Sequence, residues 1–228
     1  MQNSDFVPPQ NYGGVKISHI TETRKGRFAL FCEENGEESF IFSVDGETLI
    51  KYNISEGSLL SGEELYCVRQ QSDIRRAKDK ALEYIGMRDY AETELYKKLL
   101  LKFDKHTSAE VIRWLKELEM LDDRNFACHR AQYLFNKGKS RVQVTAALRG
   151  LGISTENIET ALNTVQPDDE KLVLSLIEKS YGEKLRRGKR ENVTAALLRR
   201  GFPVRIVVSA INAYCEENEI AESGYFDF

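Results

Sequence analysis

One five-residue segment occurs twice in this chain, and the two copies lie 49 positions apart. VTAALRGLGI covers residues 144–153, and VTAALLRRGF covers residues 193–202. In each copy a glycine, Gly152 or Gly201, is expected to stop a helix, and the apolar pattern that follows it also recurs after 49 positions. Two segments that share a helix, a stop and a restart in the same register predict one supersecondary unit that is used more than once.

From Ser72 onward, apolar residues recur at the i, i+3, i+4 spacing of helices. The stripes predict three helices before residue 121, three more up to residue 165 and three more up to residue 215. The third of these helices would open with a Thr107–Glu110 capping box, and Pro167 would occupy the first turn of the seventh. Within this pattern, VTAAL is interpreted as the buried face of a middle helix, with small alanines that let neighbouring helices approach closely.

The residues before this helical region are typical of β structure. RFALFCEENGEESFIFSVDG contains two apolar runs around an Asn-Gly pair, which is a strong hairpin signal, and ETLIKYNI is expected to add a third strand. We therefore expect a small antiparallel sheet over about residues 14–54, followed by a loop that reaches Gly62.

The predicted fold class is mainly α, with tandem three-helix repeats that form an elongated, curved body and a small N-terminal antiparallel β segment. The expected parts are an N-terminal extension with the sheet at residues 1–71, repeats at 72–121, 122–165 and 166–215, and an acidic tail at 216–228. A unit of fewer than about 50 residues is near the limit of independent stability, so the repeats should stack. Stacked repeats offer a long surface to a long partner.

Charge is separated along the chain. Residues 1–71 contain six lysines and arginines against eleven acids, residues 72–215 contain 27 against 20, and residues 216–228 contain five acids and no base. A basic middle part can attract nucleic acid or an acidic protein surface although the net charge is −3.

Composition limits the class of protein further. No apolar run approaches the ~18 residues of a membrane span, so no membrane passage is expected. The start of the chain does not resemble a signal peptide. Four scattered cysteines without CxxC spacing favour free thiols in a reducing cytoplasm, and no zinc-like pattern joins them to the histidines.

Two motifs that could suggest chemistry have simpler interpretations. KGKSR at residues 137–141 resembles the end of a phosphate-binding loop but lacks the preceding glycine and strand, so an interhelix turn with solvent-facing bases is expected. Asp122 and Asp123 are adjacent at a helix start, where capping is favoured over acid/base or metal chemistry. We predict no catalytic residues, no metal site and no cofactor.

The strongest functional signal is a basic segment at residues 184–205, which carries eight bases and one acid. A solvated face is the plain alternative. However, bases recur at equivalent positions of the second repeat, which predicts a basic stripe suited to a phosphate backbone or an acidic groove. The predicted partner- and DNA-binding residues are Lys137, Lys139, Arg141, Arg149, Lys184, Arg186, Arg187, Lys189, Arg190, Arg199, Arg200 and Arg205.

Aromatic residues are sparse near these bases. Trp114, Tyr133 and Phe135 lie in helical stripes, where an aromatic residue usually belongs to the core, so we expect backbone contacts without base readout. The acidic tail EENEIAESGYFDF is expected to be mobile, with partner docking or masking of the basic face as alternatives.

An ordered set of motifs resembles the RecX family of bacterial regulators. It comprises Ala81-Leu82-x-Tyr84-Ile85-x-x-Arg88, Glu94-Leu95-x-x-Lys98-Leu99, Leu121-Asp122-Asp123-x-x-Phe126-Ala127, Gly138-x-x-Arg141-Val142 and Leu148-x-x-x-Gly152-Ile153. The resemblance covers residues 72 to about 215. It implies tandem three-helix repeats, a cytoplasmic, non-enzymatic protein, and binding to the RecA recombinase filament on DNA. Ala91 departs from the family, which usually has a helix-capping serine at this position.

The function expected from residues and resemblance together is regulation of a RecA filament on single-stranded DNA. The protein would act as a monomer and most simply inhibit ATP hydrolysis and strand exchange. An autonomous DNA-binding protein without sequence preference is the main alternative, because helices joined by RRGFP or RGLGIS can resemble a helix-turn-helix. A hydrolase or nuclease lacks a recognisable constellation of catalytic residues.

Overall fold

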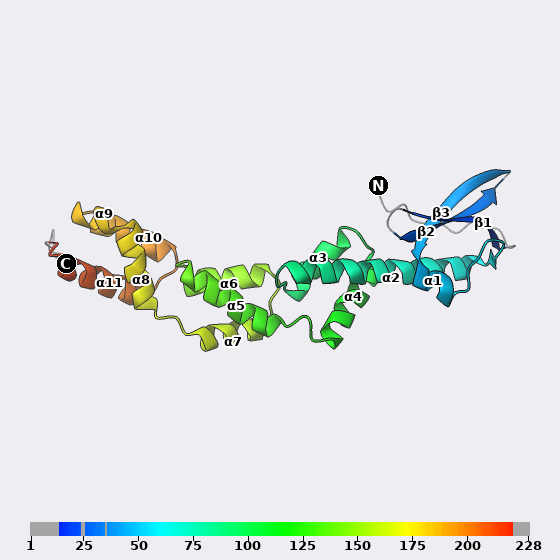
Figure 1. The fold of residues 1–228 in the computed structure, drawn as a ribbon. Coiled ribbons are helices and arrows are strands. Elements are labelled where there is room, and N and C mark those ends of the chain that lie inside the picture. Colours follow the sequence, from blue (N-terminus) through cyan, green and yellow to red (C-terminus); the bar gives the residue numbers. More distant parts are fainter. Residues whose placement is uncertain (1–13, 24–25, 35, 221–228) are drawn as a thin grey trace. The chain divides into compact units, whose positions relative to one another are not determined.

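The computed structural model describes residues 14–23, 26–34 and 36–220, in which the chain forms eleven helices and a four-stranded sheet (Figure 1). The predicted mainly helical class with an N-terminal antiparallel sheet is confirmed. The chain divides into two compact units. Unit 1 contains Met1–Asp89 and Leu95–Met120, and unit 2 contains Tyr90–Glu94 and Leu121–Phe228.

The sheet of unit 1 is antiparallel throughout and has the strand order β3-β2-β1-β4. Its strands are β1 (Val15–Glu22), β2 (Arg27–Glu34), β3 (Glu37–Asp45) and the two-residue β4 (Leu59–Leu60). The predicted hairpin is confirmed as β2 and β3. Its turn includes Gly36 at φ 84°, a conformation that glycine adopts without strain, whereas Asn35 lies outside the described residues.

The third predicted strand was wrong, because much of ETLIKYNI forms helix α1 (Gly46–Lys51). Asp45 is the cause: its carboxylate accepts hydrogen bonds from the backbone N–H and the hydroxyl of Thr48, both at 2.9 Å. This cap starts a helix directly after β3. The other two strands of the sheet are β1 and β4, and β4 lies in the segment that was predicted to be a loop.

Helix α2 (Gly62–Met87) covers the sheet and begins earlier than Ser72, where the apolar period becomes clear. Ser61 and Glu64 form a capping box at its start. The core between sheet and helix contains the fully buried side chains of Ile17, Leu30, Val44, Leu65 and Val68.

Two further helices complete the expected first repeat, α3 (Glu92–Leu100) and α4 (Lys105–Glu117). The predicted Thr107–Glu110 capping box was wrong, because Asp104 caps α4 by accepting the Thr107 N–H at 2.9 Å. Ala91 at the start of α3 is fully buried. The missing serine cap is replaced by the carboxylate of Asp123, which accepts the Glu92 N–H at 2.8 Å.

Unit 2 contains the helices of the second and third expected repeats. They are α5 (Asp123–Asn136), α6 (Arg141–Gly150), α7 (Thr155–Val165), α8 (Asp169–Ser180), a short unpredicted α9 (Gly182–Arg186), α10 (Arg190–Arg199) and α11 (Val204–Glu217). The predicted position of Pro167 in the first turn of α8 was wrong, because Asp168 caps the helix and accepts the Lys171 N–H. The domain boundaries and the elongated stacking of the repeats stay predictions.

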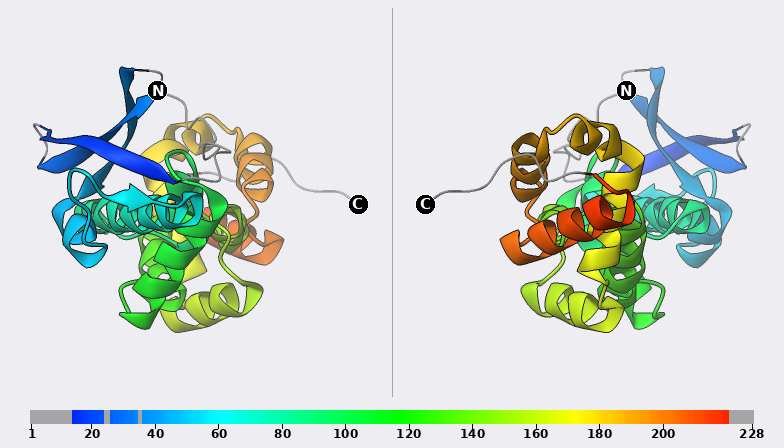
Figure 2. Two further views of the ribbon diagram at one scale, coloured as in Figure 1. Left: turned by 90° about the vertical axis from the view of Figure 1, so that its right-hand side faces the viewer. Right: turned by 90° about the vertical axis from the view of Figure 1, so that its left-hand side faces the viewer.

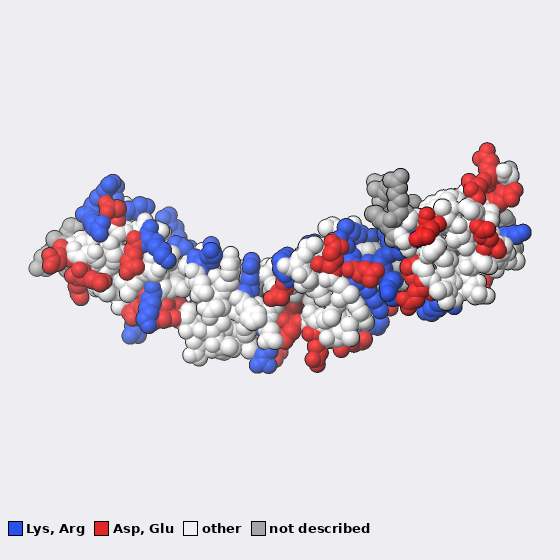
Figure 3. Space-filling view, in the orientation of Figure 1, with Lys and Arg blue, Asp and Glu red and all other residues white. Residues whose placement is uncertain are grey.

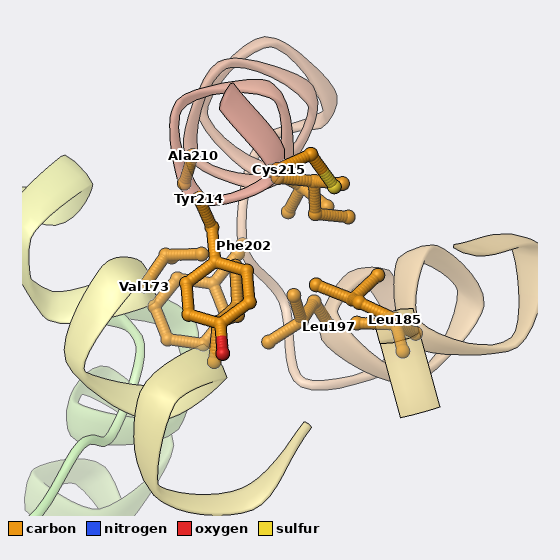
Figure 4. Packing of buried hydrophobic residues seen from close by; sticks show 11 residues of the cluster. Val173, Leu185, Leu197, Phe202, Ala210, Tyr214 and Cys215 are labelled. Carbon is orange, nitrogen blue, oxygen red and sulfur yellow. The ribbon is translucent and has the colours of Figure 1, made fainter. Parts of the chain in front are cut away.

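Each three-helix set of unit 2 has its own apolar core. In the second set, α5 packs against α7, and in the third set α8 packs against α11, which crosses it in Figure 2. Figure 4 shows Phe202, Tyr214 and Val173 meeting in the third core, with Leu197 and Leu185 beside them. The expected grouping of apolar stripes therefore corresponds to real cores.

The interpretation of the VTAAL segment needs a correction. Val144 and Leu148 of the first copy are fully buried, but Ala146 and Ala147 are exposed. Residues four apart share a helix face, and the alanines between them point away from it. The segment therefore buries its valine and leucine, and the alanines do not serve close packing within the bundle.

Candidate nucleic-acid interface

The middle helices α10 and α6 meet end to end. The hydroxyl of Ser140, which caps α6, donates a hydrogen bond to the Arg200 carbonyl oxygen at the end of α10, at 2.5 Å. The Arg200 guanidinium in turn donates to the Gly138 carbonyl oxygen at 3.1 Å. These two bonds bring the C-terminus of α10 next to the N-terminus of α6.

The same arrangement recurs between α6 and the start of α3, which also belongs to unit 2. Gly152 and Gly201 end their helices at φ 86°, as predicted. A Cβ on Gly152 would lie 2.5 Å from Thr93, and one on Gly201 would lie 2.8 Å from the Cβ of Val142. Since Thr93 and Val142 are themselves 49 positions apart, the sequence period is also the period of a repeated contact between helix ends within unit 2, which we call the joint.

This end-to-end contact brings basic residues of two repeats close together. The segment before α10 carries Lys184, Arg187 and Lys189, and the end of α10 that carries Arg199 lies beside the turn that carries Lys137 and Lys139. Arg149 stands at the far end of α6. Figure 3 shows lysines and arginines gathered over α9 and α10, on the side of unit 2 that faces upward.

Three of the twelve predicted residues are held in contacts within the fold. Arg141 forms an ion pair with Asp169 at 3.0 Å, and Arg190 donates to the Asn212 side chain. Arg200 belongs to the joint described above. These three arginines hold helices together, so the expectation that Arg141 simply faces solvent was wrong.

Arg186 is an intermediate case, because it forms an exposed ion pair with Glu183 at 2.6 Å. Such a surface pair is weak and can exchange for another anion. The remaining eight bases form no ion pair with a carboxylate in the described part of the chain. We call them the basic row; they are Lys137, Lys139, Arg149, Lys184, Arg187, Lys189, Arg199 and Arg205.

A pocket of about 600 Å³ borders the basic row between α5 and α8. Besides Lys137 it is lined by Lys171 and Lys179, two bases that the sequence analysis did not select. Asp168 pairs with Lys171 at 3.1 Å. The Lys171 backbone N–H and ammonium group hold the pKa of this exposed carboxyl below its ordinary value. The pocket lining therefore carries three lysines and one ionised carboxylate, which neutralises Lys171.

The two adjacent acids at the start of α5 do not converge on one site. Asp122 accepts the N–H groups of Arg124 and Asn125 at 2.9 and 3.0 Å, as predicted for a cap, whereas Asp123 is bonded to Glu92. Among the described residues, no group of three or more His, Cys, Asp or Glu side chains could hold a metal ion. Both acids therefore serve the fold.

The three aromatic residues singled out in the sequence differ in their surroundings. Phe135 is 2% exposed and Trp114 is half-buried beneath the Lys78 ammonium, as expected of residues in helical stripes. Tyr133 is 51% exposed on α5, so its assignment to the core was wrong. Nearby Arg130 was not selected, although its spacing of three from Tyr133 already puts the two on one helix face.

No helix in the described part of the chain is long and apolar enough to cross a membrane. Of the predicted acidic tail, Ile220 packs against the third core of unit 2, and residues 221–228, which include its aromatics, lie outside the described residues.

Comparison with known proteins gives concordant matches. The family model described as "RecX, second three-helix domain" matches residues 122–162. The regulatory protein RecX of Clostridium tetani is 30% identical over 169 residues, which cover 73% of this chain and 76% of the relative. The regulatory protein RecX of Bacillus velezensis is 24% identical over 214 residues, which cover 89% and 79%.

Solved structures share the fold. A crystal structure of regulatory protein RecX superimposes with a TM-score of 0.63 at 22% identity, covering 87% of this chain and 99% of that one. RecX from Lactobacillus salivarius superimposes with a TM-score of 0.54 at 24% identity, covering 65% and 98%.

Proposed function

Because this chain belongs to the RecX family of regulatory proteins, we propose that it regulates the RecA recombinase by binding the RecA filament on single-stranded DNA. In this proposal the protein acts as a cytoplasmic monomer. When it is bound to the filament, it slows ATP hydrolysis and strand exchange by the filament.

The observation that carries the proposal is the basic row. Its eight bases form no ion pair in the described part of the chain, and they come from two repeats whose middle helices are hydrogen-bonded to each other at their ends. Basic residues that a folded contact brings together suit a polyanion, because each neutralised phosphate releases a condensed counterion. A bound filament offers such a polyanion together with the protein that coats it.

Regulation without catalysis follows from differential binding. A ligand shifts an equilibrium only by as much as its affinities for the two states differ. A protein that binds the filament more tightly in one state than in another therefore slows its cycle without chemistry of its own. The relatives' designation as regulatory proteins supports this view.

The rival function is autonomous DNA binding through α11 as a recognition helix. Such a helix needs polar side chains that reach base edges. Its exposed face instead carries Val204 and Val208, and the hydroxyl of Ser209 is bonded to Glu170 at 2.6 Å. Arg205 alone contributes a base there, which favours phosphate contacts over sequence readout.

The test is RecA ATP hydrolysis on single-stranded DNA with the protein titrated in, alongside its own DNA binding at two salt concentrations. We expect suppression at protein concentrations too low to cover the DNA directly. Unchanged hydrolysis together with steeply salt-dependent DNA binding would support the rival.

A charge-reversal variant identifies the surface. Lys137→Glu, Lys139→Glu, Arg187→Glu and Lys189→Glu together should abolish suppression. The control reverses the same number of exposed bases outside the row, Lys97, Lys102, Lys105 and Arg113, and should behave as wild type. If the control variant loses as much suppression as the row variant, net charge rather than the basic row is responsible.

A further inference from the structure

Tyr133 is unusual among the aromatic side chains of unit 2. It lies near the C-terminal end of α5 and is 51% exposed, whereas Phe135, Phe202 and Tyr214 are all buried to at least 95%. Unlike Phe135, its ring contributes nothing to the described core of the second bundle. A large, half-exposed ring that packs in no core is available to a ligand.

Two cations lie over the Tyr133 ring. The guanidinium carbon of Arg130 lies 5.3 Å from the ring centroid, and the Lys137 ammonium lies 5.7 Å from it. Both distances fall within the range of cation–π attraction. The residues are spaced at i−3 and i+4 along α5 and its C-cap, so the helix keeps both charges near the ring, and an incoming base takes the place of one of these flexible side chains.

Lys137 connects this ring to the basic row. It belongs to the turn that the Arg200–Gly138 hydrogen bond holds against the end of α10. A nucleic-acid strand whose phosphates contact Lys137 would therefore pass directly beside the ring. Proteins that bind single strands combine these two elements, a basic track and aromatic side chains on which bases stack.

We infer that Tyr133 is a stacking platform for an unpaired nucleobase of single-stranded DNA bound along the basic row, with Arg130 and Lys137 contacting the flanking phosphates. The inference rests on the DNA-binding part of the proposed function and goes beyond it. It replaces the expectation of backbone contacts alone. A duplex keeps its bases stacked inside, so the platform selects single strands.

The test compares Tyr133→Ala and Tyr133→Phe with wild type in binding a single-stranded oligonucleotide and a duplex of equal length. Loss of one stacked base should weaken single-strand binding by about ten-fold. Duplex binding should stay within two-fold. Tyr133→Phe keeps the ring and should bind as wild type. The matched control is Tyr66→Ala, since Tyr66 is 54% exposed but lies on α2 of unit 1.

A fluorescent base reports stacking directly. 2-Aminopurine is placed at each position of the strand in turn. Wild type and Tyr133→Phe should quench its fluorescence at one or more positions, and Tyr133→Ala should not. Equal thermal unfolding of all variants is expected because the ring packs in no core.

The outcomes separate this inference from the proposed function, because the oligonucleotide carries no RecA. If Tyr133→Ala binds and quenches as wild type does, while the row variant loses binding, the platform is overturned and the basic row is kept. Equal losses on single strand and duplex, or no binding of single strands by wild type, would also overturn it. Failure to suppress RecA, with these DNA results as expected, would leave the platform standing and remove the RecA regulation alone.

Discussion

Gly201→Ala should destabilise unit 2 by far more than a methyl group on the protein surface would suggest. Gly201 has φ 86°, and an L-residue pays about 1–2 kcal/mol for a left-handed conformation. The new Cβ would also lie 2.8 Å from the Val142 Cβ and 3.2 Å from the Ser140 hydroxyl. Overpacking of this kind costs about 1–3 kcal/mol, so the expected total is about 2–5 kcal/mol.

The assay is urea unfolding followed by circular dichroism, with Gly150→Ala as the matched control. Gly150 ends α6 in a helical conformation, and a Cβ there would meet nothing within 4 Å, so this change should stabilise by up to about 1 kcal/mol. A loss below about 1 kcal/mol for Gly201→Ala would refute the reasoning. It would mean that the joint between α10 and α6 yields easily.

The same variant has a functional consequence, because it removes no charge. Moving the end of α10 away from α6 would separate Arg199 from the turn at Lys137. We expect weaker binding of single-stranded DNA by Gly201→Ala and faster amide hydrogen exchange around Ser140. Unchanged DNA affinity in a clearly destabilised variant would show that the basic row does not depend on the joint.

Three further outcomes are expected. Burial alone would raise the pKa of Asp45, but hydrogen bonds from Thr48 lower this pKa overall. The contribution of Asp45 to stability is therefore present above about pH 4 and lost as the pH falls through the folded-state pKa. Asp45→Asn should make the melting temperature of unit 1 depend less steeply on pH in acid, and an unchanged slope would contradict this. Ser140→Ala removes a helix cap and the hydrogen bond to Arg200, and should lower the free energy of unfolding in urea by about 1–3 kcal/mol. An unchanged free energy of unfolding would mean that water replaces both bonds. Asp123→Ala should increase hydrogen exchange at the first turn of α3 without affecting α8, and equal exchange in both helices would argue against a local cap.

The helices could be predicted from the sequence because their apolar period is local, but only some of their caps could. Asp122 caps α5 as expected and the glycines at 152 and 201 end their helices, whereas Asp104 and Asp168 cap α4 and α8 in place of the expected residues. The apolar run after Asp45 was misassigned because a short run fits a strand as well as a helix, and only the cap decides.

The candidate site was predictable in part. The clusters of bases were visible, and so was their recurrence. The sequence did not show which bases remain available to a partner, because the groups that hold Arg141 and Arg200 lie 28 and 62 residues away along the chain. Tyr133 was missed because its stripe contains both buried and exposed aromatics, and a helical period alone does not separate them.

The end-to-end contact of α10 and α6 also has a length. Each of the two ten-residue helices is about 15 Å long at the helical rise of 1.5 Å per residue, so the pair spans at most about 30 Å. At the roughly 3.4 Å per nucleotide of a duplex strand, that distance holds about nine nucleotides, and a more extended single strand covers it with fewer. One molecule should thus occlude a footprint of no more than about nine nucleotides, and oligonucleotides much shorter than this should engage only one of the two repeats.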